Sequence, residues 1–164
     1  MKALKWTLTA TAVVTLMTLG APIHAQAQTA AHDHGSAPQA LTLNHGQKWA
    51  TDAPLRKGMD GIRGLVAPQL KAAHAGKLSA AQYKQLAGKI EREVADIVEN
   101  CKLEPAADAQ LHGLIAEIGA GVDAMNGKSA DTRPVDGLLK VTHAVNQYPH
   151  YFDHPGFRAL PIAY

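Results

Sequence analysis

Cysteine and aromatic residues are scarce in this sequence of 164 residues, which has a single cysteine, Cys101, and is only 5% aromatic. A lone cysteine cannot form an internal disulfide, so a disulfide scaffold is excluded. Charge of one sign is not in excess either. Once Lys2 and Lys5 are set aside, 14 Lys and Arg residues remain against 14 Asp and Glu residues. This balance argues against nucleic acid as a partner. The length of 164 residues indicates one domain, and the hydrophobic content of 46% excludes a disordered tail.

Residues 1–27 are predicted to be a secretory signal peptide. A basic start is followed by an apolar stretch over residues 6–19, which is too short to cross a bilayer core of about 30 Å as a helix. Small residues then provide a cleavage site at Ala27, with cuts after Ala25 or Ala31 as alternatives. No later apolar run approaches membrane length. We therefore expect a periplasmic protein that does not insert into the membrane after the leader is cleaved.

Residues 28–48 are predicted to form a flexible arm. They are rich in alanine, glutamine, glycine, threonine and histidine and show little apolar periodicity. The arm carries His32, His34 and His45, and the first two flank an aspartate in a weak metal-binding pattern.

Four helical segments are predicted over residues 49–148, because apolar residues recur there every three or four positions. They span residues 54–75 with a kink at Pro68, residues 80–101 behind a capping box of Ser79 and Gln82, residues 105–126, and residues 134–148. No strand pattern of period two competes, and the connections are short. The expected fold is all-α, an up-down-up-down antiparallel four-helix bundle.

Residues 149–164 form a tail of different character. Five of the seven aromatic residues that follow the leader lie after position 147, and prolines break the segment into turns. We expect this tail to fold back and pack on an open end of the bundle.

Alternating helix directions bring four soft donors toward one end of the predicted bundle. Met59 lies near the start of the first helix, Cys101 at the end of the second, His112 near the start of the third and His143 near the end of the fourth. Each donor also has a purely structural interpretation. Met59 and Cys101 continue apolar stripes and suit core positions, whereas His112 and His143 lie off those stripes and suit the surface.

Three functions fit this grouping. The first is binding of a transition metal, copper before zinc, because thiolate, thioether and imidazole groups suit Cu(I), and His150 and His154 of the tail can reach the same end. The second is electron transfer by a b-type haem held between Met59 and His143 or His150. That arrangement resembles the periplasmic cytochrome b562 in position, and covalent haem attachment is excluded because the sequence has no CxxCH motif. The third is a structural or interaction module without a cofactor.

An enzyme is not expected. The sequence shows no Ser-His-Asp or Cys-His motif in local context, no glycine-rich phosphate loop after a strand and no Glu-x-x-His pair for a di-iron site. Cys101 is left with three roles: a buried thiol, a ligand, or a disulfide that links two copies into a dimer.

Three phrases of the sequence are distinctive: LNHGQKWATDAPLRKGMDGIR, ENCKLEPAADAQLH and YPHYFDHPGF. They resemble the small exported proteins called DnrO, and the likeness covers residues 41–160. That family occurs in denitrifying proteobacteria, and its name implies an association with nitrate respiration and nitric oxide. The resemblance therefore implies a setting of periplasmic denitrification, in which copper and haem enzymes are abundant, without choosing between the two cofactors.

Overall fold

Helices account for the regular structure of residues 40–161, the part of the chain that this computed structural model describes. They are α1 (Ala53–Val66), α2 (Leu70–His74), α3 (Ala80–Asn100), α4 (Pro105–Met125) and α5 (Pro134–Tyr151). Within the described residues, β pairing is limited to two isolated bridges. The prediction of an all-α fold is thus confirmed for residues 40–161, whereas the predicted signal peptide and the first part of the arm lie outside the described residues.

The helices begin where the sequence provides caps. Asp52 caps α1 by accepting a hydrogen bond from the Leu55 amide. Ser79 and Gln82 form the predicted capping box at the start of α3, and α4 and α5 both begin with a proline, whose missing N–H has no partner to lose in a first turn. In the first predicted helix, Pro68 divides α1 from α2 with a short 3₁₀ turn at Ala67–Gln69.

The last helix runs three residues further than the periodicity predicts, from Pro134 to Tyr151. Pro149 lies in its final turn, so the missing N–H removes one hydrogen bond close to the end of the helix and does not stop it. The carbonyl of Tyr151 accepts a hydrogen bond from the Trp49 amide at 2.8 Å. The chain before α1 therefore supplies a hydrogen-bond donor to a carbonyl at the end of α5.

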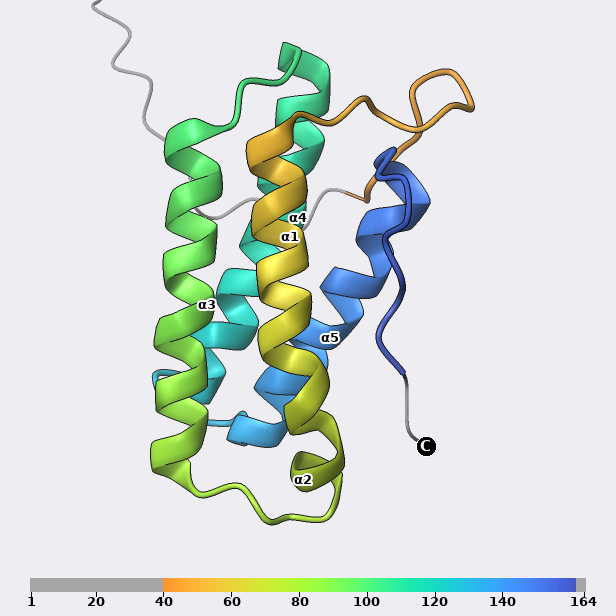
Figure 1. Cartoon of the computed structure of the whole chain (residues 1–164). Coiled ribbons are helices and arrows are strands. Elements are labelled where there is room, and N and C mark those ends of the chain that lie inside the picture. The colour runs from red at the N-terminus through yellow and green to blue at the C-terminus, as the bar shows by residue number, and fades with distance from the viewer. Residues whose placement is uncertain (1–39, 162–164) are drawn as a thin grey trace, which may run out of the picture. The chain divides into compact units, whose positions relative to one another are not determined.

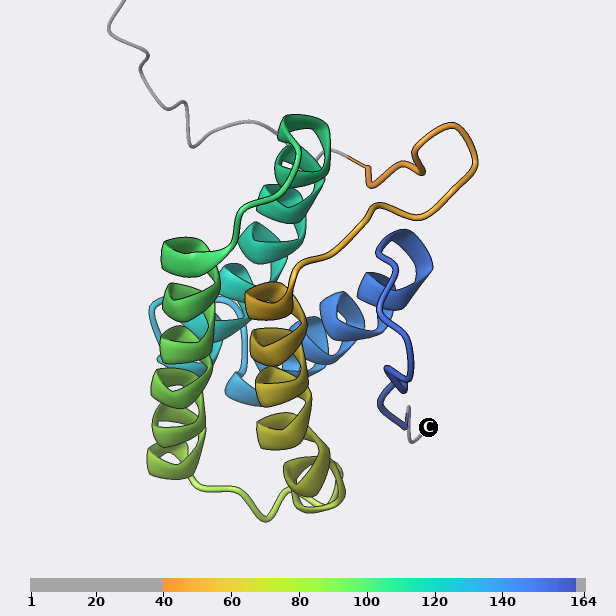
Figure 2. The ribbon, with the colours of Figure 1, turned by 45° about the horizontal axis from the view of Figure 1, so that its top comes forward.

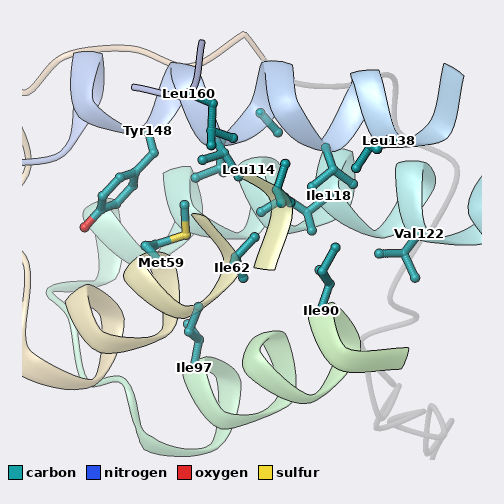
Figure 3. Packing of buried hydrophobic residues seen from close by; sticks show 14 of the residues in the cluster. Met59, Ile62, Ile90, Ile97, Leu114, Ile118, Val122, Leu138, Tyr148 and Leu160 are labelled. Carbon is teal, nitrogen blue, oxygen red and sulfur yellow. The ribbon is translucent and has the colours of Figure 1, made fainter. Parts of the chain in front are cut away.

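Consecutive long helices run in opposite directions, and α1 packs against α3, α3 against α4, and α4 against α5 (Figure 1). The backbones of α4 and α5 approach each other closely at Gly121 and Gly137. A Cβ built on Gly121 would lie 2.6 Å from the Gly137 carbonyl oxygen. Side chains from all four long helices fill the space between them (Figure 3). Those with no exposed surface include Leu55, Met59, Ile62, Ile90, Ile97, Leu114, Ile118, Leu138, Val145 and Tyr148.

The segments on either side of the helices pair with each other. Trp49 forms a parallel bridge with Phe152, and both residues are buried. Beyond Phe152 the chain turns back along α5 (Figures 1 and 2), where the side chain of Asn146 exchanges two hydrogen bonds with the backbone of Leu160. Among the described helices, none is long and apolar enough to cross a membrane.

Candidate functional site

Asp52 ties the start of α1 to the end of α3, at the end of the helices where the sequence places the soft donors. One carboxylate oxygen accepts the Leu55 amide at 2.9 Å, and the other accepts the Lys102 amide at 2.6 Å. The thiol of Cys101 lies 3.5 Å from the first of these oxygens and donates to it. One carboxylate thus caps one helix and holds the residues that follow another.

Cys101 is a half-buried thiol in a negative environment. Burial first, then the charge of Asp52, the hydrogen bond to Asp52 and the charge of Asp108, together raise its pKa from 9.0 to about 12. The thiol is therefore protonated at neutral pH, whereas the nucleophilic and metal-binding form of cysteine is the thiolate. This position does not resemble the electropositive surroundings of reactive cysteines.

Of the predicted donors, Cys101 and His112 come together. They line one cavity of about 190 Å³ between the end of α3 and the start of α4. Its other lining residues are Ile97, Val98, Asp108, Leu111 and Ile115. His112 is 67% exposed, and its Nδ1 atom lies 2.9 Å from the carbonyl oxygen and 3.3 Å from the carboxylate of Asp108.

Met59 and His143 do not line this cavity. Met59 has no exposed surface and points into the core beside Tyr148 and Ile62 (Figure 3). His143 is exposed, and its Nε2 atom lies 3.4 Å from the amide nitrogen of Gln147, one turn further along the same helix. The haem ligands of the second hypothesis therefore lie in opposite environments, one enclosed by the core and one in solvent.

The two tail histidines also differ from each other. His150 is exposed, whereas the side chain of His154 is only 6% exposed. Its Nδ1 atom lies 3.2 Å from the hydroxyl of Tyr148, its Nε2 atom lies 3.5 Å from Asp60, and its ring contacts that of Phe157 at a centroid distance of 5.0 Å. Burial lowers the pKa of His154 below 6.5, and the nearby Asp60 opposes that shift only in part. His154 thus acts as a neutral anchor of the tail.

The described part of the chain contains no group of three or more His, Cys, Asp or Glu side chains placed to hold one metal ion. A tetrahedral site needs four ligands within about 2.0–2.3 Å of the ion. The pair of Cys101 and His112 supplies two candidates, so a tetrahedral site here would need two further donors from elsewhere.

Two parts of this region are not expected from the sequence. By residue type, Thr51 or Asp52 can cap the first predicted helix, but the contacts of Asp52 with Cys101 and Lys102 arise from tertiary packing that leaves no local signal. The pairing of His154 with Tyr148 is equally hidden, because the prolines around residue 150 suggest an irregular tail and give no side-chain directions.

No protein-family model, curated protein or solved structure matches this chain. The resemblance to the DnrO proteins therefore stays a prediction.

Proposed function

We propose that this chain is an exported interaction module without a cofactor, built as an up-down-up-down four-helix bundle and working in the periplasm. The observation that carries the proposal is the separation of the soft donors. Met59 is enclosed by the core while His112 and His143 face solvent. A protein that held copper or haem at this end would need these side chains turned toward a common centre.

The packing of the core supports the same proposal. Buried side chains from α1, α3, α4 and α5 belong to one cluster that occupies the space between the helices, and in it Met59 lies beside Tyr148 of α5 (Figure 3). A haem would need that space, and opening it would expose several side chains that now have no accessible surface. The resemblance to DnrO adds a denitrification setting to the proposal, in which the partner would be another exported protein.

The test is metal analysis and an absorbance spectrum of the mature protein purified from its native periplasm. We expect less than stoichiometric metal and no Soret band. Stoichiometric copper or a Soret band would overturn the proposal. The wild-type protein and its His143→Ala variant should give the same metal content and the same spectrum, because the proposal assigns His143 no cofactor to bind.

A second candidate function is copper binding by Cys101 and His112, favoured by the one observation that both line the same cavity. Binding would displace the thiol proton, so affinity should rise with pH. The assay is competition for Cu(I) against a chromophoric chelator, with Cys101→Ser and His112→Ala as test variants and His143→Ala as the control. A disulfide-linked dimer through Cys101 stays a prediction, and the raised pKa of the thiol would slow its formation.

A further inference from the structure

The outer face of α4 is a stripe of small uncharged residues. Ala109, Ala116 and Ala120 are exposed on it, together with His112. These positions are three or four residues apart, so they lie side by side along one face of the helix. We refer to these four residues as the outer α4 face. A helix backbone from another molecule can approach the three alanines of this face closely, because no long side chain stands at those positions.

A cavity whose lining is mainly aliphatic, with Cys101, Asp108 and His112 at it as well, opens beside this face. His112 belongs to both, and Val98 of α3 stands at the cavity with 60% of its surface exposed. The volume of about 190 Å³ exceeds the ~150 Å³ of an apolar cavity that holds one benzene molecule, so the cavity can take one aliphatic or aromatic side chain. Val98, Leu139 and Leu43 are the large apolar side chains exposed in the described residues, and Val98 is the most exposed of them.

Acidic residues outnumber basic residues around the face. Asp108 and Glu117 lie on either side of the stripe, and α4 contains no Lys or Arg from Pro105 to Met125. On the segment that runs from the cavity into α4, residues 97–108, acidic side chains outnumber basic ones: Glu99, Glu104 and Asp108 against Lys102. The electrostatic potential here attracts a cationic partner and disfavours an acidic one.

We propose that the outer α4 face and its cavity dock a basic amphipathic helix of a partner protein, with one apolar side chain of that helix in the cavity next to Val98. The inference rests on the proposed function and identifies the kind of partner. A second copy of this chain is disfavoured, because it would bring two acidic faces together. Residues 28–39 of the arm contain no Lys or Arg, so they lack the charge that the face attracts.

The test is calorimetric titration of the mature, metal-free protein with a synthetic amphipathic helical peptide of leucine, alanine and lysine. The charge control is the same peptide with glutamate in place of lysine. We expect saturable binding of the lysine peptide alone, which weakens as salt is added. Equal binding of both peptides, or no binding of the lysine peptide, would overturn the inference.

Two variants locate the binding surface. Val98→Lys should weaken binding about tenfold or more, because an ammonium group would replace the apolar contact. Leu139→Lys is the matched control, since it makes the same change at an exposed leucine of α5 that is 41% exposed, and it should bind like wild type. Equal losses in the two variants would contradict the assignment, and circular dichroism confirms that each is folded.

Two further measurements separate this inference from the proposed function. Sedimentation velocity of the free protein should show a monomer, and self-association that Val98→Lys abolishes would mean that a second copy occupies the face. Metal analysis of the same sample tests the proposed function by itself. A metal-free protein that fails to bind the lysine peptide overturns only the docking inference.

Discussion

The crossing of α4 and α5 provides a test in which the same substitution has opposite effects at two neighbouring positions. Gly121 faces α5, and a Cβ there would lie 2.6 Å from the carbonyl oxygen of Gly137 and 3.0 Å from the amide nitrogen of Val141. Both are backbone atoms of a helix and cannot rotate away. Gly119, two residues earlier on the same helix, has open space where a Cβ would be added.

The expected magnitudes follow from two opposing effects. Replacing glycine by alanine inside a helix stabilises it by about 1 kcal/mol, and this is the whole effect expected for Gly119→Ala. At Gly121, overpacking costs about 3 kcal/mol, at the upper end of the usual range because the obstructing atoms are backbone. Gly121→Ala should therefore destabilise the fold by about 2 kcal/mol after the gain in helix propensity is subtracted.

The assay is urea and thermal unfolding of the mature protein followed by circular dichroism. At roughly 4 °C per kcal/mol for a domain of this size, Tm should fall by about 8 °C in Gly121→Ala and rise by about 4 °C in Gly119→Ala. Gly137→Ala should behave like Gly121→Ala, since its Cβ would lie 2.5 Å from the Gly121 carbonyl oxygen. If Gly121→Ala were as stable as Gly119→Ala, the helices would not cross at this separation and the reasoning would be refuted.

Three further predictions concern the region of the soft donors. Asp52→Asn keeps an N-cap residue but removes its charge, so the pKa of Cys101 should fall from about 12 toward 9.0. Iodoacetamide should then alkylate the thiol faster at mildly alkaline pH. An unchanged dependence of the alkylation rate on pH would mean that burial alone sets the pKa of Cys101. Because the pKa of His154 is lowered in the folded state, the unfolded chain binds a proton that the folded chain does not. The free energy of unfolding should therefore fall as the pH drops below 6.5. Urea unfolding should show that His154→Gln loses this pH dependence. Met59→Ala should cost about 2–5 kcal/mol of unfolding free energy through the cavity it leaves, and similar small losses in Met59→Ala and His143→Ala would contradict the placement of Met59 in the core.

The sequence predicts the helices well because their signals are local. The capping box of Ser79 and Gln82, the cap at Asp52 and the interruption at Pro68 all act within a few residues of themselves, and each lies where the pattern places it. Pro149 shows the opposite case. Its effect depends on how many turns follow it and on what meets the end of the helix, and the contact of Trp49 with Tyr151 comes from a distant part of the chain.

The candidate site shows why position along a helix is not enough to predict a binding centre. Helix length and direction place Met59, His112 and His143 at similar heights, but whether a side chain faces inward depends on its angle around the helix axis. Met59 lies on the apolar stripe and is drawn into the core, while His112, one residue beyond Leu111, is turned outward by about 100°. A shift of one residue therefore separates a buried ligand from a surface side chain, and a site built from single donors on several helices requires every one of those angles to be right.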